Sequence, residues 1–140
     1  MRKLILTPHF TVTKVNPTKL TLHLKKRWYD MIKSGEKPEE YRAATDYWLK
    51  RLYYKTGDGY YMPKHFDLLE LCCGYPAADD NTRRMLFANP YFIWGLGQKK
   101  WGAPGDGRTV IIIRWESRFI DLDELEKKYG REPNLKEIIL

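Results

Sequence analysis

The sequence contains few cysteines and no long apolar run. Its only cysteines, Cys72 and Cys73, are adjacent, and neighbouring cysteines do not close an ordinary disulfide loop, so we expect no disulfide framework and a reducing compartment. The longest aliphatic run is Val110–Ile113, whereas a membrane-spanning helix needs roughly 20 apolar residues. The apolar stretch Leu4–Leu6 is too short for a secretory signal. These features favour a cytoplasmic protein with no membrane contact.

Paired metal ligands are also missing from the sequence. The histidines His9, His23 and His65 and the two cysteines show none of the C-x2-C or H-x3-H spacings that are typical of zinc sites. We therefore expect neither a metal ion nor another cofactor. The two cysteines are interpreted as small hydrophobic residues near the end of a strand.

Aromatic and basic residues, in contrast, are plentiful. The 140 residues are 43% hydrophobic and 14% aromatic, which predicts one compact domain and excludes a wholly disordered chain. The net charge of +7 is uneven, because residues 1–64 hold 14 basic and 6 acidic side chains and residues 65–140 hold 11 and 12. Aromatic residues lie among the basic clusters Lys25–Arg27 and Lys50–Arg51, namely Trp28, Tyr41, Trp48, Tyr53 and Tyr54. This mixture favours nucleic-acid binding, although it also fits a solvated basic face over a core.

Hydrophobic periodicity predicts short strands interleaved with short helices. Strands are expected at Leu20–Lys25, Glu39–Arg42, Phe66–Cys73, Tyr91–Gly97 and Thr109–Trp115, after extended segments at Leu4–Leu6 and Phe10–Val12. Helices are expected at Lys26–Ser34, at a segment capped by Thr45 or Asp46 that carries Trp48, Leu49 and Leu52, and from Asp121 or Asp123 to Gly130. Between two of the predicted strands lies Gly74–Asn89, whose polar stretch Asp79–Arg84 is expected to be a surface excursion. The predicted fold class is α+β, with a strongly bent mixed sheet or a small β-barrel and short flanking helices.

The segment Gly35–Arg42 carries the most functional information, because it reads G-x-K-x-x-E-x-R directly after a predicted strand and helix. Gly35 suits the left-handed end of a helix, and Glu40 and Arg42 share one face of the strand that follows. Lys37 and Glu40 would oppose each other in a straight strand, but Pro38 makes a bend plausible that lets them converge. The three charged residues can bind an anion while orienting a hydrogen-bonding ring, or they can neutralise one another as a structural ion-pair network.

This motif resembles that of the ASCH domain, a member of the PUA-like superfamily of small β-barrels. Further segments look like the phage- and prophage-borne branch of that family, namely Leu22–Lys25, Trp28–Lys33, Tyr47–Trp48 and Lys100–Gly105. The resemblance covers roughly Leu20 to Ile120. It implies an ASCH or PUA-like domain at residues 20–120, and the sequence pattern adds an N-terminal extended arm at residues 1–19 and a C-terminal helical extension at residues 121–140.

The resemblance implies a cleft that receives RNA or a nucleotide-like ligand and is lined by Gly35, Lys37, Glu40 and Arg42. Some members of the superfamily are hydrolases, including an amidohydrolase of an acylated cytidine with a lysine at the place of Lys37 and a threonine at the place of Glu40. The alternative function is therefore a hydrolase of a modified nucleoside or of RNA, with Lys37 and Glu40 as acid and base and Glu70 as a second carboxylate. A third hypothesis is an interaction module whose basic face binds an acidic protein partner. The sequence leaves open whether the protein is an enzyme.

Residues near the ends of predicted strands supply further candidate ligand contacts. Tyr75 and Trp101 are expected to stack on bases if their two loops flank the cleft, and Lys25 is placed to meet a phosphate. The Gly97–Gly107 loop is rich in glycine and basic residues, so it is predicted to close over the ligand with Trp101 as its contact residue. The alternative is that Trp101 packs permanently against the domain and the loop only shapes a turn.

Overall fold

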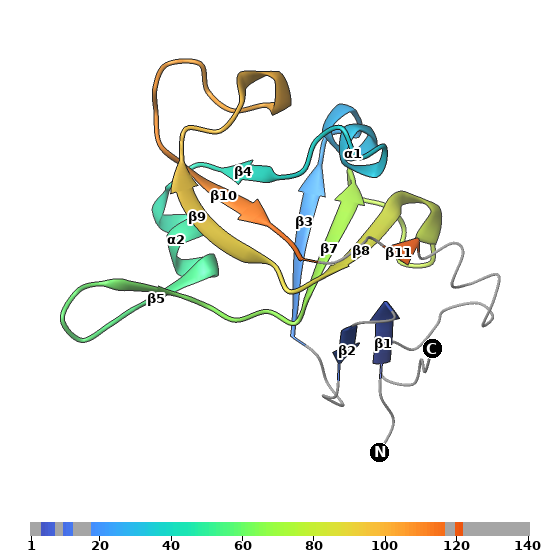
Figure 1. Cartoon of the computed structure of the whole chain (residues 1–140), viewed down its shortest axis with the longest axis horizontal. Coiled ribbons are helices and arrows are strands. Elements are labelled where there is room, and N and C mark those ends of the chain that lie inside the picture. The colour runs from blue at the N-terminus through green and yellow to red at the C-terminus, as the bar shows by residue number, and fades with distance from the viewer. Residues whose placement is uncertain (1–3, 8–9, 13–17, 117–119, 122–140) are drawn as a thin grey trace.

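The computed structural model describes residues 4–7, 10–12, 18–116 and 120–121, and these residues form an α+β fold with open sheets (Figure 1). The largest sheet has the strand order β11 (Ile120–Asp121), β8 (Arg84–Ala88), β7 (Leu68–Cys73) and β3 (Lys19–Leu24). The second has the order β4 (Glu40–Arg42), β10 (Val110–Arg114) and β9 (Tyr91–Gly95). Two smaller sheets pair β1 (Leu4–Thr7) with β2 (Phe10–Val12), and β5 (Tyr53–Lys55) with β6 (Tyr61–Pro63).

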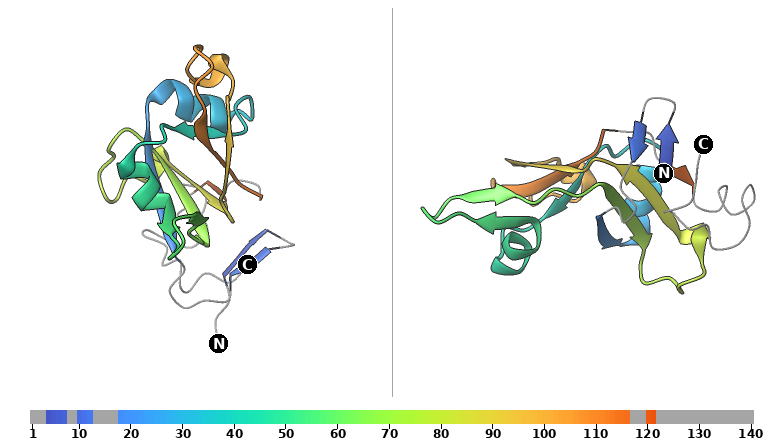
Figure 2. Two further views of the ribbon diagram at one scale, coloured as in Figure 1. Left: turned by 90° about the vertical axis from the view of Figure 1, so that its left-hand side faces the viewer. Right: turned by 90° about the horizontal axis from the view of Figure 1, so that it is seen from below.

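The two larger sheets pack against one hydrophobic core. In β3 leucines alternate with polar residues, so the three leucines are buried in the core while Thr21 and His23 lie on the opposite face. β3 pairs in parallel with β7, which pairs in antiparallel with β8. From the second sheet, Ile111 and Ile113 of β10 enter the same core. The side view in Figure 2 shows the two sheets on either side of the molecule.

Two short helices connect the sheets. α1 (Lys26–Lys33) directly follows β3 and buries Tyr29 and Ile32, and Gly35 after its end has a φ of +86°. α2 (Asp46–Leu52) begins after Thr45, whose hydroxyl accepts a hydrogen bond from the Trp48 N–H at 3.4 Å. Both helices were predicted, and Thr45 is the cap of the second.

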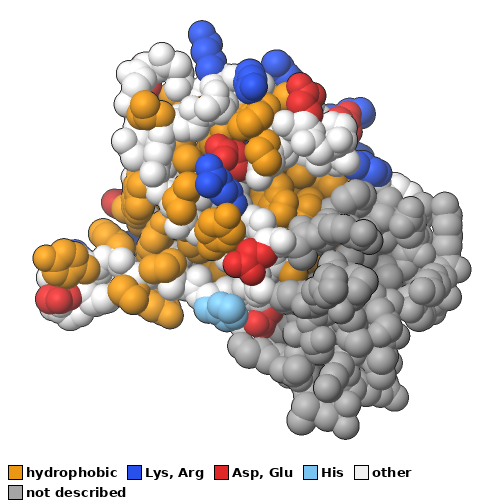
Figure 3. Space-filling model, in the orientation of Figure 1, with side chains coloured by type: hydrophobic (Ala, Val, Ile, Leu, Met, Phe, Trp, Pro, Cys, Tyr) orange, Lys and Arg blue, Asp and Glu red, His pale blue; other side chains and the backbone are white. Residues whose placement is uncertain are grey.

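The β5–β6 hairpin extends away from the rest of the molecule (Figures 1 and 2). It follows α2 and turns at the Gly57–Gly59 segment, where the sequence predicted a turn. Most of its exposed large side chains are aromatic, namely Tyr54, Tyr60 and Tyr61, together with Met62. Figure 3 shows the resulting hydrophobic surface on this protruding part.

The segment Gly74–Asn89 contains one strand that the sequence did not predict. Residues 84–88 form β8, in which Met85, Leu86 and Ala88 are fully buried. The polar residues 79–84 make the segment look exposed, but the short apolar run after them becomes a strand because β7 supplies its backbone hydrogen-bond partners. Ile120–Asp121 form β11, and the helix predicted beyond them lies outside the described residues.

The strands that the sequence predicted within residues 18–116 are confirmed to within two residues at each end, as β3, β4, β7, β9 and β10. Cys72 and Cys73 are buried at the end of β7, as the sequence predicted. No helix in the described part of the chain is long and apolar enough to cross a membrane.

Candidate ligand-binding pocket

A pocket of about 650 Å³ lies between β3, β4, α2 and the loops that follow β7 and β9. It is mostly lined by aromatic and charged side chains, with one carboxylate among several cations. Its lining consists of Thr21, His23, Leu24, Lys25, Trp28, Glu40, Tyr41, Arg42, Tyr47, Trp48, Arg51, Tyr75, Trp101 and Gly102. Segments far apart in the sequence therefore build one concave surface.

Five of the eight residues proposed from the sequence line this pocket, namely Lys25, Glu40, Arg42, Tyr75 and Trp101. The described lining residues do not include Gly35, Lys37 or Glu70. Gly35 follows the end of α1, where its positive φ allows the chain to leave the helix. The G-x-K-x-x-E-x-R motif thus places only its glutamate and arginine in the pocket wall.

Lys37 lies behind the pocket wall and contacts Glu40. Its Nζ is 2.7 Å from Glu40 Oε1, which also accepts the Tyr41 N–H at 3.0 Å. The lysine is only 1% exposed, and its Nζ lies 4.6 Å from the centre of the Trp28 ring. Burial lowers the pKa of Lys37, although the neighbouring Glu40 carboxylate opposes this effect. Lys37 and Glu40, on either side of Pro38, therefore converge, as the sequence suggested.

Two arginines of the pocket lining are held by backbone carbonyls. Arg42 donates through NH1 to its neighbour Tyr41 O at 2.7 Å and through NH2 to His23 O at 3.3 Å. Arg51 donates to Thr21 O at 2.9 Å. The guanidinium carbons of Arg42 and Arg51 lie 5.0 Å and 5.7 Å from the Trp48 ring centre. Arg42 NH1 is also 3.3 Å from Glu40 Oε2, so the two motif residues contact each other.

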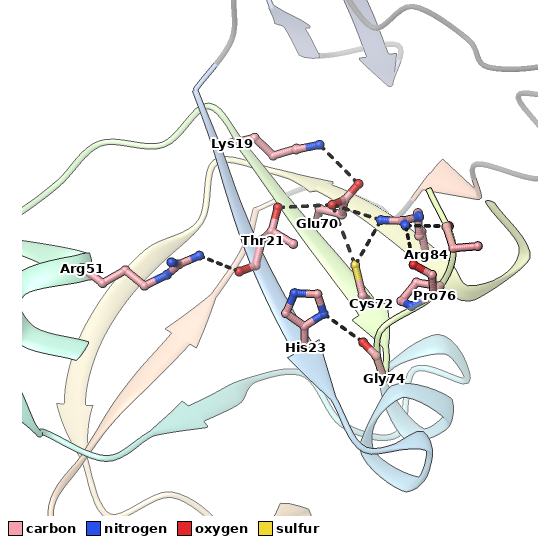
Figure 4. Close-up of polar contacts among 10 residues, drawn as sticks. Lys19, Thr21, His23, Arg51, Glu70, Cys72, Gly74, Pro76 and Arg84 are labelled. Atoms are coloured by element: carbon pink, nitrogen blue, oxygen red, sulfur yellow. Dashed lines mark hydrogen bonds and ion pairs between the residues drawn. The ribbon is translucent and has the colours of Figure 1, made fainter. Parts of the chain in front are cut away.

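His23 and Tyr75 form a stacked pair at the end of β3. Their ring centres are 4.2 Å apart with an interplanar angle of 17°. His23 Nδ1 is 2.8 Å from Gly74 O, and because a carbonyl only accepts, Nδ1 must carry the hydrogen (Figure 4). This hydrogen bond fixes the orientation of the His23 ring.

Glu70 belongs to a separate polar cluster on the neighbouring strand β7 (Figure 4). Its carboxylate accepts hydrogen bonds from Lys19 at 3.3 Å and from the Thr21 hydroxyl at 3.2 Å, and it pairs with Arg84 at 3.6 Å. Cys72 lies in the same cluster, where burial raises the pKa of its thiol to about 11. Thr21 connects this cluster to the pocket, since it also lines the pocket.

Trp101 is half-buried in the pocket wall. It ends the short 3-10 helix Lys99–Trp101 and packs against the apolar cluster that contains Tyr41, Ala103 and Val110. The loop is also tied to the motif, because Tyr41 OH accepts the Gln98 N–H at 2.9 Å and donates to Glu39 at 2.6 Å. These contacts favour the packing alternative for the loop, while Trp101 still lines the pocket.

Several pocket residues were not proposed as site residues from the sequence. They include Trp28, Trp48, Arg51, Thr21, His23 and Tyr47. The alternation in Leu20–Lys25 contained a signal for Thr21 and His23, because the residues between buried leucines must face away from the core. Trp48 and Arg51 are three apart on α2 and therefore share one side of the helix.

A scan against models of known protein families finds no match, and neither the curated proteins nor the solved structures show a match. Within residues 4–7, 10–12, 18–116 and 120–121, no group of three or more histidine, cysteine, aspartate or glutamate residues could hold a metal ion.

Proposed function

We propose that the pocket binds a nucleotide, either free or as an unpaired residue of single-stranded RNA. The observation that carries the proposal is the lining itself, which combines several aromatic rings with Lys25, Arg42 and Arg51 and has the single carboxylate of Glu40. Cations neutralise phosphate, and aromatic surfaces accept bases of any sequence. A volume of about 650 Å³ is within the range of small-molecule sites.

An unpaired nucleotide fits this pocket better than a duplex does. Side chains cannot read the deep major groove of A-form RNA, whereas unpaired bases can enter a pocket and stack there. The concentration of positive charge in residues 1–64, which supply Lys25, Arg42 and Arg51, supports a phosphate-bearing ligand.

We also propose that the chain is related to the ASCH domains and that its fold is a PUA-like barrel. The support is local: the glutamate and arginine of the motif lie on β4 in the wall of the pocket, where the resemblance implies a ligand. The α+β fold is compatible with this relationship.

The hydrolase alternative has less support from the geometry. Lys37 is enclosed by Glu40, Trp28 and Tyr41 instead of facing the pocket, and Glu70 lies in its own cluster on β7. A direct acid or base role for either group would need a rearrangement of the wall. An acidic protein partner remains the third hypothesis, and the binding experiment separates it from nucleotide binding.

The experiment is a titration of labelled single-stranded RNA at several salt concentrations. The affinity should fall as salt rises, with a log-log slope of about −0.7 for each phosphate that is neutralised. Arg51→Gln should weaken binding roughly tenfold or more, the range for a hydrogen bond to a charged group. Lys55→Gln is the matched control, since Lys55 is an exposed cation of the hairpin and does not line the pocket.

Two outcomes would contradict the proposal. One is the lack of RNA binding at low salt, which would favour the acidic protein partner. The other is equal weakening by Arg51→Gln and Lys55→Gln, which would indicate a diffuse basic surface. Chromatography of the RNA after incubation tests the hydrolase alternative, because a binder returns the RNA intact.

A further inference from the structure

We propose that the base of the bound nucleotide stacks on the outer face of Tyr75, and that the pocket tryptophans hold cations instead of bases. This inference rests on the proposed function and assigns its stacking surface. It starts from the question of which aromatic faces in the pocket are still open to a ligand.

The faces of Trp48 and Trp28 are approached by cations of the protein. Trp48 has the guanidinium carbons of Arg42 and Arg51 at 5.0 Å and 5.7 Å from its ring centre. Trp28 has Lys37 Nζ and the Arg27 guanidinium carbon, each at 4.6 Å. A base that stacked on these rings would displace a cation–π contact.

Other groups of the protein also cover parts of Trp28 and Trp101. Gly102 packs so closely on Trp28 that an added Cβ would lie 3.1 Å from the indole. Trp101 has Lys100 Nζ at 4.7 Å from its ring centre and packs against the Tyr41 cluster. The tryptophans therefore serve to position positive charge around the pocket, in particular the two arginines on Trp48.

Tyr75 differs from the tryptophans because it is 86% exposed. One face of its ring stacks on His23 at 4.2 Å, and no other ring or cation contact to it is found among the described residues. Tyr75 is one of the residues that line the pocket, and its high exposure leaves the face away from His23 accessible. A flat π-system of the ligand can extend the His23–Tyr75 stack without displacing a protein group.

The loop that carries Tyr75 is held in place from both sides (Figure 4). Gly74 donates its N–H to Leu24 O at 2.7 Å and accepts from His23 Nδ1 at 2.8 Å. Arg84 donates to the carbonyls of Pro76 at 3.2 Å and Ala77 at 2.9 Å. An exposed ring on a fixed backbone loses little freedom when a ligand binds, which favours affinity.

The cluster around Glu70 supports the same loop. Glu70 pairs with Arg84 at 3.6 Å, and Lys19 and Thr21 hold the carboxylate from β3. Glu70 thus contacts Arg84, which donates to the carbonyls of the two residues that follow Tyr75.

The test compares adenosine 5′-monophosphate with ribose 5-phosphate, which keeps the phosphate and lacks the base. Tyr75→Leu should weaken binding of the nucleotide by about tenfold, within the roughly 5- to 150-fold range of one stacking contact, and leave ribose 5-phosphate unchanged. Tyr75→Phe is the matched control and should bind both within about twofold of the wild type. Because the side chain is 86% exposed, all three proteins should fold equally well.

Trp48→Leu should behave differently from Tyr75→Leu. Because Trp48 supports Arg42 and Arg51, its loss should weaken the binding of adenosine monophosphate and of ribose 5-phosphate by the same factor. The contrast between the two variants separates a ring that binds the base from a ring that holds the phosphate-binding arginines.

The possible failures are distinguishable. The stacking role is refuted, and the proposed function stands, if the wild type binds the nucleotide and Tyr75→Leu binds it equally well. The same holds if Tyr75→Leu weakens the binding of ribose 5-phosphate as much as that of the nucleotide. If the wild type binds neither probe nor single-stranded RNA, the proposed function fails and this inference fails with it.

Discussion

Replacing Lys37 by methionine should destabilise the protein strongly. The ammonium group is 1% exposed and forms a 2.7 Å ion pair with Glu40, whose carboxylate is also buried. Methionine keeps most of the apolar stem but leaves the Glu40 carboxylate with only the Tyr41 N–H and Arg42 as partners. The loss of the closer of its two cationic partners, and not a cavity, is therefore the source of the predicted loss.

The expected loss is about 3–5 kcal/mol, the usual cost of removing one partner of a buried ion pair. With a urea dependence of about 1.5 kcal/mol per molar, this lowers the unfolding midpoint by roughly 2–3 M. The double variant Lys37→Met, Glu40→Gln should recover most of the loss, because it removes both charges and keeps an acceptor for the Tyr41 N–H. The coupling between the two sites should be about 2 kcal/mol or more.

Urea denaturation followed by circular dichroism measures these changes. Lys26→Met is the matched control, since Lys26 forms an exposed i,i+4 pair with Asp30 on α1 and its removal should change the midpoint very little. If Lys37→Met were no more destabilising than Lys26→Met, or if the double variant were as unstable as the single one, the argument from the buried charge would be refuted.

Three further outcomes are expected. Gly102→Ala should lower the free energy of unfolding by about 1–2 kcal/mol or more, since φ is +103° and the new Cβ would lie 3.1 Å from the Trp28 indole on α1. Gly107 has a similar φ of +79° but open space around it, so Gly107→Ala should lower the free energy of unfolding less when both variants are measured by urea denaturation. Cys72 should resist iodoacetamide at pH 8 in the folded protein and react once unfolded, because its thiol is buried and its pKa is raised to about 11; rapid labelling of the native state, seen by mass spectrometry, would disprove this. Asp67→Ala should lower the free energy of unfolding by about 1–3 kcal/mol, because its carboxylate accepts both the N–H and the hydroxyl of Thr18 at the start of β3; a neutral effect on thermal unfolding would contradict that role.

The sequence predicted the parts of the fold that depend on local patterns. The alternation in Leu20–Lys25 determines a strand with one buried face, and the β-branched run in Thr109–Trp115 determines another. α1 and α2 followed from apolar spacing and from helix ends at Gly35 and Thr45. β8 was missed because four apolar residues after a polar segment carry no local period, and their burial depends on pairing with β7.

Local patterns also indicated that Glu40 and Arg42 of the motif lie on one face, because residues two positions apart on a strand share a face. What each residue of the candidate site touches was decided by the tertiary structure. Lys37 lies behind the pocket wall because Glu40 and Tyr41 of β4 and Trp28 of α1 enclose it, so its position depends on how this helix and this strand are placed together. The pairing of His23 with Tyr75 joins residues 52 positions apart, which the β3–β7 register brings together. Contacts between distant segments depend on how sheets and loops pack, and no periodicity of the chain encodes them.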